Sequence, residues 1–206
     1  MYKKFPTLIP IFPLSGVIYF PKTNLPLHIF EQRYLNLVND TFKKDKLMGM
    51  IQSTKDDDKV YKVGCLGKIS DHQKSSDGRV LINLKGLIRF EIIEEVNNSK
   101  LYREFKVDYK KFTLDTNSLT KEINTELLME KAKTFFEKNG LILNWKEFDK
   151  LDKVSKVDTL AMIAPVTNEE KQKLLESVSL SEKVTILENI INFYLHEVGF
   201  NNQTIQ

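Results

Sequence analysis

The 206-residue sequence contains one cysteine, Cys65, and only three histidines. A lone cysteine cannot close a disulfide within the chain, and so few Cys and His residues leave no set of ligands for structural zinc. No run of about 18 apolar residues is present, so the sequence predicts no transmembrane helix. The first residues also lack the apolar segment and cleavage site of a secretory signal. These absences predict a cytoplasmic protein without a metal, a cofactor or a membrane anchor.

Proline is scarce and unevenly placed, because five of the six prolines lie within the first 26 residues. Proline fixes φ and lacks an amide hydrogen, so this region cannot form a long helix and is typical of strand ends, edges and turns. Short apolar stretches follow over the first 112 residues, at 8–12, 17–20, 47–51, 60–69, 80–84, 87–96 and 101–112. They predict a β-rich lobe over 1–112, with strands half open to water.

Two local patterns refine this lobe. Asp77-Gly78 stands between two apolar stretches and favours a tight hairpin turn, while Val80, Ile82 and Leu84 alternate with more polar residues. One helix is predicted over 31–44, where apolar residues recur at spacings of three and four and form one stripe. The stripe consists of Phe30, Tyr34, Leu37, Val38 and Phe42.

The pattern changes after residue 112. Residues 113–119 are polar and are predicted to be a linker, and residues 120–199 are predicted to be a helical lobe. Helices are expected over 120–139 and 145–163, after a capping box at Thr167–Glu170, and from 180 to about 198 with Gly199 as the stop. Residues 200–206 form a polar tail. The fold class expected from these patterns is α+β.

Charge is divided between the two halves of the chain. Residues 1–112 carry 20 Lys and Arg against 13 Asp and Glu, whereas residues 113–206 carry 11 against 15. A basic lobe of this kind is compatible with RNA binding. It is equally compatible with attraction between two oppositely charged lobes, and an excess of +7 is modest for a dedicated nucleic-acid binder.

The sequence offers little support for catalysis. No phosphate-binding loop with the pattern Gly-x-x-x-x-Gly-Lys-Ser/Thr is present. The nearest stretch, Gly64 to Ile69, lacks the glycine spacing and ends in isoleucine, where a magnesium-binding hydroxyl is required. No Gly-x-Ser-x-Gly nucleophile motif occurs either. The sequence therefore predicts a protein that is not an enzyme.

Four ordered motifs resemble one known family. Residues 9–21 (IPIFPLSGVIYFP) and 25–34 (LPLHIFEQRY) resemble the opening signature of the LON substrate-recognition domain, the N-terminal domain of the Lon protease family. Residues 63–69 resemble its second strand motif, residues 77–90 its hairpin and Gly-x-x-Arg-Phe strand, and residues 160–176 its terminal helical motif. The resemblance covers roughly residues 8–195, which is nearly the whole chain.

The resemblance implies a curled, PUA-like β-barrel lobe with one inserted helix, followed by a helical bundle. It also implies a free-standing module that recognises unfolded or apolar protein segments and takes part in protein quality control or proteolysis. A separate ATPase or protease is a further candidate partner, since neither of those domains of Lon is recognisable here. The alternative function is RNA binding by the basic β lobe, although nucleic acid is the less favoured partner.

Six residues are the candidate peptide-binding site. Phe20, Pro21, Leu25 and Pro26 read as an apolar, proline-stiffened loop, which would lose little entropy on docking a peptide. The alternative is that this loop plugs the mouth of the barrel. His28 and Arg33 complete the set; Arg33 is equally able to form an ion pair with Glu31, and His28 and Glu31 are too few to hold a metal. Arg89 is expected to be buried beside an acid or a main-chain carbonyl.

Overall fold

The computed structural model describes residues 5–54, 59–116 and 123–201, with only the backbone described at 197–201. The chain divides into two compact units, residues 1–117 and residues 118–206. The first unit holds all the described strands and the second holds only helices, so the protein belongs to the α+β class. Within the described residues, no helix combines the length and the apolar character that crossing a membrane requires.

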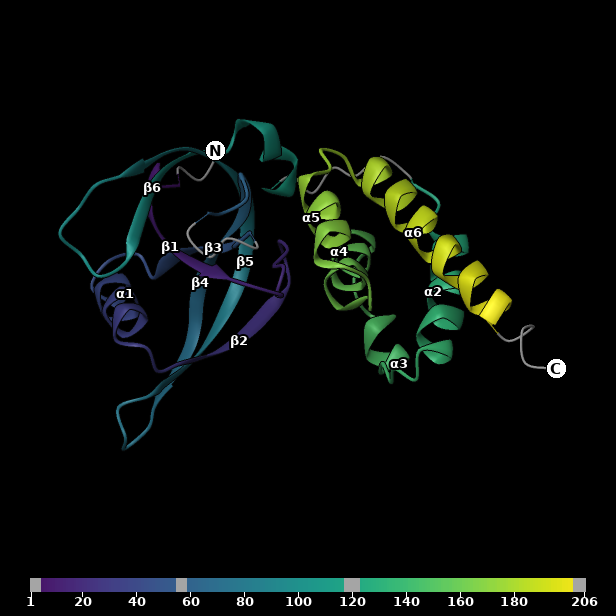
Figure 1. The fold of residues 1–206 in the computed structure, drawn as a ribbon, viewed down its shortest axis with the longest axis horizontal. Helices are drawn as coiled ribbons and strands as arrows, with labels where there is room; N and C mark the ends of the chain where they lie inside the picture. The colour runs from purple at the N-terminus through teal and green to yellow at the C-terminus, as the bar shows by residue number, and fades with distance from the viewer. Residues whose placement is uncertain (1–4, 55–58, 117–122, 202–206) are drawn as a thin grey trace. The chain divides into compact units, whose positions relative to one another are not determined.

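The first unit is a mixed sheet that closes on itself (Figure 1). Its elements in chain order are β1 (Leu8–Leu14), β2 (Asn24–Ile29), α1 (Gln32–Phe42), β3 (Leu47–Gln52), β4 (Val63–Lys74), β5 (Val80–Val96) and β6 (Arg103–Asp108). The strand order is β2-β5-β4-β3-β1-β6, and a further pairing of β5 with β6 joins β1, β3, β4, β5 and β6 into a ring. β1 and β3 are parallel, and the other pairs are antiparallel.

β5 is the strand on which the ring depends. It is 17 residues long and pairs with β2 over its first six residues, with β4 along most of its length, and with β6 from Glu91 onward. The predicted hairpin at Asp77-Gly78 is confirmed, because it joins β4 to β5 with Gly78 at a φ of 87°. The apolar stretches at 80–84 and 87–96 belong to one strand, whose register with β4 shifts at Gly86, where Gly67 pairs with Gly86 and Leu66 pairs with Ile88.

Gly86 is required by a close approach of two backbone segments. A Cβ atom at this position would lie 2.2 Å from the carbonyl oxygen of Phe20. The Lys22 N–H donates to the Gly86 carbonyl (3.1 Å), and the Gly86 N–H donates to the Thr23 carbonyl (2.9 Å). Residues 17–20 are therefore a loop fastened against β5, and the prediction of a strand at 17–20 is wrong. The proline-flanked segment that follows is the strand, β2.

The predicted helix at 31–44 is confirmed as α1, with a correction at its start. Tyr34, Leu37 and Val38 are buried and Phe42 is half-buried, and the Tyr34 ring lies 4.1 Å from that of Phe12 on β1. Phe30 is 63% exposed and precedes the helix, so it does not belong to the buried stripe. The backbone at residue 31 is extended, which turns the chain before the helix begins and directs Phe30 to solvent.

The predicted β stretch at 101–112 ends earlier than expected, because β6 stops at Asp108. A 3-10 helix, η1 (Lys110–Thr116), follows it, includes the first residues of the predicted linker and contacts β5. Arg89 and Asp115 form a buried ion pair, with Nε 3.0 Å from Oδ2 and Nη2 2.7 Å from Oδ1. The Arg89 amide also donates to Oδ2 (2.9 Å), and the guanidinium lies 4.4 Å from the centre of the Phe112 ring. The expectation that Arg89 is buried beside an acid is confirmed. Residues 117–119 lie outside the described residues.

Loss of the Arg89 guanidinium should destabilise the first unit strongly. Arg89→Met leaves the Asp115 carboxylate buried without its counter-ion, which costs about 3–5 kcal/mol of unfolding free energy. The matched control is Lys106→Met, which breaks the exposed pair with Glu94 and should cost at most about 1 kcal/mol. Urea unfolding followed by far-UV circular dichroism measures both changes. Equal costs for the two variants would contradict the structural role of the buried pair.

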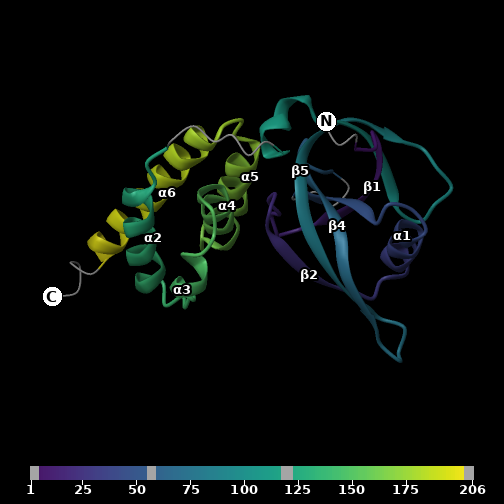
Figure 2. The same ribbon diagram turned by 180° about the vertical axis from the view of Figure 1, so that it is seen from behind.

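The second unit contains five helices in its described part. They are α2 (Glu126–Lys138), α3 (Trp145–Phe148), α4 (Lys153–Ile163), α5 (Asn168–Glu176) and α6 (Leu180–Asn201). α6 contacts α2, α4 and α5, and it lies beside α2 in both Figure 1 and Figure 2. Leu128, Phe135, Leu160, Leu187 and Ile191 contribute to the buried interior of this unit.

Helix caps explain where these elements begin. The capping box predicted at Thr167–Glu170 is confirmed, with the Glu170 amide donating to the Thr167 hydroxyl and the Thr167 amide donating to the Glu170 carboxylate. The single helix predicted over 145–163 is wrong, because the Asp152 carboxylate accepts from the amides of Val154 and Ser155 and starts a new helix there.

The ends of two other helices also differ from expectation. The helix predicted from residue 120 begins at Glu126, where the Asn124 side chain accepts from the first helical amide (2.9 Å). Residues 120–122 lie outside the described residues. The predicted stop at Gly199 is wrong, because α6 continues to Asn201.

Lys183 on α6 and Asp158 on α4 form an ion pair in the interior of the second unit. Their side chains are 4% and 2% exposed, and the ammonium donates directly to the carboxylate. Both groups lose their hydration on folding, so each needs the other to offset that loss. The pair joins two helices that are distant in sequence and fixes how they pack.

Lys183→Met should therefore destabilise the second unit by about 3–5 kcal/mol, because it leaves the Asp158 carboxylate buried alone. The single tryptophan, Trp145, packs against Phe136 and Phe148, so its fluorescence reports on this unit during urea unfolding. Lys150→Met is the control, since it breaks an exposed pair with Glu147. A midpoint for Lys183→Met no lower than that of the control would show that the buried pair adds nothing.

Candidate functional site

The candidate site is β2, the last strand on one side of the sheet. Its residues alternate strictly, with Leu25, Leu27 and Ile29 buried and Asn24, Pro26 and His28 exposed. β5 pairs with β2 on one side only, and within the described residues no strand pairs with the other side. A strand of this kind offers both a solvent-facing row of side chains and a free backbone edge.

Proline determines which peptide groups face that free edge. Pro26 lies opposite Asn83 in an antiparallel pair, and it has no N–H to donate. We infer that this pair is of the non-hydrogen-bonded type, in which both residues direct their peptide groups away from each other. By alternation, the peptide groups of Asn24 and His28 also face away from β5. The edge therefore offers the N–H and C=O groups of residues 24 and 28 and the carbonyl of residue 26.

Apolar side chains are exposed at one end of this edge. Phe30 is 63% exposed and its ring centre lies 6.2 Å from that of His28, in an edge-to-face arrangement. Leu81 on β5 lies directly opposite His28 in the register and is 45% exposed. Opposite residues on neighbouring strands project from the same face of a sheet. His28, Phe30 and Leu81 thus form one exposed patch, which we call the edge patch.

The structure separates the predicted peptide-binding residues into two groups. Phe20, Pro21 and Leu25 are buried, with Phe20 fully inaccessible. Their burial leaves them little surface with which to contact a peptide directly. Leu25 and Pro26 are not part of a loop, since both belong to β2. The buried group supports the edge, and as a peptide-binding site the six residues remain a prediction.

Pro26, His28 and Arg33 are the exposed members of the predicted set. Arg33 donates to the Glu31 carboxylate (Nε to Oε2, 2.9 Å) and lies 4.5 Å from the centre of the Tyr34 ring. The ion pair expected from sequence is therefore confirmed. The Arg33 side chain is still 54% exposed, so it remains accessible at the start of α1.

Sequence reasoning missed two members of the edge patch. The sequence pattern places Phe30 in the buried stripe of the helix, and it gives Leu81 no functional role. Leu81 is an apolar residue on the solvent side of a strand whose buried side is already supplied by Val80, Ile82 and Leu84. An apolar residue on the outward side was the signal that could have identified it.

The site contains no arrangement that suggests catalysis. Among the residues that the structure describes, no group of three His, Cys, Asp or Glu side chains is placed to hold a metal ion. Cys65 is fully buried on β4, and its thiol lies 3.6 Å from the carbonyl oxygen of Leu66. A reactive thiol needs access to solvent and a neighbouring base or cation, and the burial of Cys65 removes the first of these.

Comparison with known proteins is consistent across sequence and structure. The family model of the ATP-dependent protease La (LON) substrate-binding domain matches residues 8–192. The Lon protease of Syntrophus aciditrophicus is 25% identical, over 98% of this chain and 27% of its own length. The Lon protease of Dictyoglomus thermophilum is 23% identical over 87% of this chain and 23% of its own length. The chain thus spans about a quarter of the curated relatives it matches.

Solved structures show the same fold. The Lon N-terminal domain protein from Xanthomonas campestris superposes with a TM-score of 0.65 at 20% identity, covering 91% of this chain and 99% of that one. The N-terminal domain of the Lon protease from the Mycobacterium avium complex gives a TM-score of 0.63 at 15% identity, covering 90% and 98%. With the family model matching nearly the whole length, the chain belongs to the LON substrate-binding domain family.

Proposed function

We propose that this chain is a substrate-recognition module that binds apolar, unfolded segments of other proteins and performs no chemistry on them. The observation that carries the proposal is the match of residues 8–192 to a substrate-binding family, joined to the free edge of β2. We also propose that a bound segment is passed to a separate ATPase or protease in protein quality control.

The mode of binding proposed is strand addition to β2. The backbone of an extended, unfolded segment forms hydrogen bonds with the outward peptide groups of residues 24, 26 and 28. This backbone pairing does not depend on the amino-acid sequence of the bound segment. Selectivity comes from the edge patch, where Phe30 and Leu81 bury apolar side chains of the bound segment. Pro26 interrupts the row of donors and so limits pairing between the edges of two copies of the chain.

Two features of the fold belong to the same proposal. The ring of β1, β3, β4, β5 and β6 supports classing the first unit with PUA-like barrels. The packing of α6 on α2, α4 and α5 supports a helical bundle in the second unit. We place client binding in the first unit, because the described free strand edge lies there.

Replacement of one amide tests strand addition. His28→Pro and His28→Ala both remove the imidazole, but only the proline variant also removes the N–H that faces the free edge. Affinity for a fluorescein-labelled, reduced and unfolded α-lactalbumin, measured by anisotropy, should be about fivefold weaker for His28→Pro than for His28→Ala, since one hydrogen bond is lost. Circular dichroism shows that both variants are folded. Equal affinities would rule out pairing at this edge.

The absence of chemistry is tested separately. Incubation of the chain with unfolded casein, ATP and magnesium should leave the casein intact on a gel and release no phosphate above the rate of a buffer control. Cleavage or ATP hydrolysis that persists through repeated purification would contradict the proposal. A failure to bind unfolded α-lactalbumin at tens of micromolar would contradict its central claim.

A further inference from the structure

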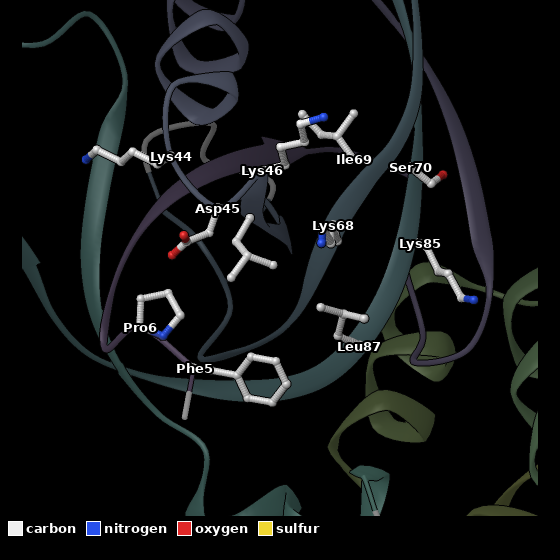
Figure 3. A pocket seen from close by; sticks show the side chains of 11 residues that line it. Phe5, Pro6, Lys44, Asp45, Lys46, Lys68, Ile69, Ser70, Lys85 and Leu87 are labelled. Carbon is white, nitrogen blue, oxygen red and sulfur yellow. The ribbon is translucent and has the colours of Figure 1, made fainter. Parts of the chain in front are cut away.

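A second concave site lies on the first unit. It is an open pocket of about 920 Å³ lined by the segment before β1, the turn between α1 and β3, and strands β4 and β5 (Figure 3). Phe5, Pro6, Leu47, Ile69 and Leu87 supply its apolar side chains. In Figure 3 the Phe5 ring and Leu87 lie at one end of the pocket, and Ile69 lies at the other end beside Lys46. The volume falls within the range of known ligand pockets.

Four lysines surround this apolar surface. Lys44 and Lys46 come from the turn before β3, Lys68 from β4 and Lys85 from β5. Within residues 5–54, 59–116 and 123–196, none of these four ammonium groups forms an ion pair with a carboxylate. The lining includes one acid, Asp45. The pocket therefore carries an excess of positive charge that its own residues do not neutralise.

The register places two of these lysines in an unfavourable position. Lys68 and Lys85 lie directly opposite each other on the antiparallel pair β4–β5, and both are exposed. Like charges at opposite positions of neighbouring strands destabilise a sheet. This arrangement works against the stability of the barrel, and a ligand that carries negative charge would relieve the repulsion.

Lys46 adds an independent observation. Its backbone has a φ of 60°, in the left-handed region that favours glycine. The conformation is enforced on both sides, because the Lys46 amide donates to the Thr41 carbonyl (3.1 Å) and the Lys46 carbonyl accepts from the Ile69 amide (2.9 Å). The Lys46 ammonium lies 5.6 Å from the centre of the Phe42 ring on α1, which holds the side chain at the border of the pocket.

We propose that this pocket binds acidic segments of client proteins that also carry apolar side chains. The lysines would pair with aspartate and glutamate side chains, while the partly exposed side chains of Phe5, Leu47 and Leu87 would cover a leucine or phenylalanine. The inference rests on the proposed function and names the class of client that the first unit selects. Protein fits better than nucleic acid, because Phe5 is the single aromatic residue of the pocket lining and offers no platform for stacking successive bases.

Paired peptides of twelve residues test this assignment on the full chain. One alternates Asp and Glu with Leu and Phe, and its partner has Asn and Gln in place of the acids, with both labelled by fluorescein. The acidic peptide should bind about tenfold more tightly at low salt, and its advantage should shrink as salt is added. A neutral peptide that binds equally well would overturn the inference.

Charge-neutralising variants locate the effect. Lys68→Gln with Lys85→Gln removes the opposed charges without threatening the fold, and should weaken the acidic peptide about tenfold while leaving the neutral peptide unchanged. The matched control, Lys106→Gln with Lys110→Gln, lowers the net charge equally at exposed positions outside the pocket and should change affinity less than about twofold. Equal losses of affinity for the acidic peptide in the two double variants would show a general effect of net charge, and would overturn the assignment of binding to the pocket.

Two further outcomes are decisive. A labelled single-stranded RNA of the same length that binds more tightly than the acidic peptide, and loses affinity in the Lys68/Lys85 variant, would reassign the pocket to nucleic acid. The affinity for unfolded α-lactalbumin could depend on the amide at position 28 while the affinity for the acidic peptide is unchanged in the Lys68/Lys85 variant. This result would leave the proposed function standing and overturn only this inference.

Discussion

β5 pairs with β4 and β6 to close the ring of strands, and it also carries the edge strand β2. Such sharing requires backbones to come closer together than side chains permit. The Phe20 carbonyl packs directly against Gly86, where a side chain would collide with it. The Met50 carbonyl packs in the same way against Gly64 on β4, and its oxygen would lie 2.5 Å from a Cβ atom added there. The buried pair between Arg89 and Asp115 then fixes the following segment to the same strand.

The two proposed binding regions are connected through β5. Leu81 belongs to the edge patch, and four residues later Lys85 lines the basic pocket. Lys85 also lies opposite Asn24, at the other end of β2 from the edge patch. A segment added along β2 would thus have one end near exposed apolar side chains and the other near unpaired lysines. Part of the excess positive charge of the first 112 residues is concentrated at one place, because four of their lysines surround the pocket.

Patterns set by neighbouring residues were predictable from the sequence. The turn at Asp77-Gly78, the alternation along 80–84 and the capping box at Thr167 depend on groups a few residues apart. β2 was missed because Pro21 and Pro26 suggested a loop, although Leu25, Leu27 and Ile29 alternate as a strand requires. The break before α4 was missed because Asp152 reads as an ordinary exposed acid until its amide contacts are known.

Other features are set by distant residues and could not be predicted. Arg89 and Asp115 are 26 residues apart, and Lys183 lies 25 residues from Asp158. Which acid neutralises a buried cation depends on how strands and helices pack, and no spacing rule covers these distances. The lysines of the pocket are equally dispersed along the chain, so each reads in isolation as an ordinary solvated side chain.

The burial of Cys65 has a practical consequence. The thiol is wholly inaccessible on β4, where its neighbours across the sheet are Met50 and Arg89, and the chain has no other cysteine. An alkylating reagent can modify it only during excursions in which these strands part. The rate of alkylation of the unaltered polypeptide therefore measures how often the barrel opens, with no engineered label needed.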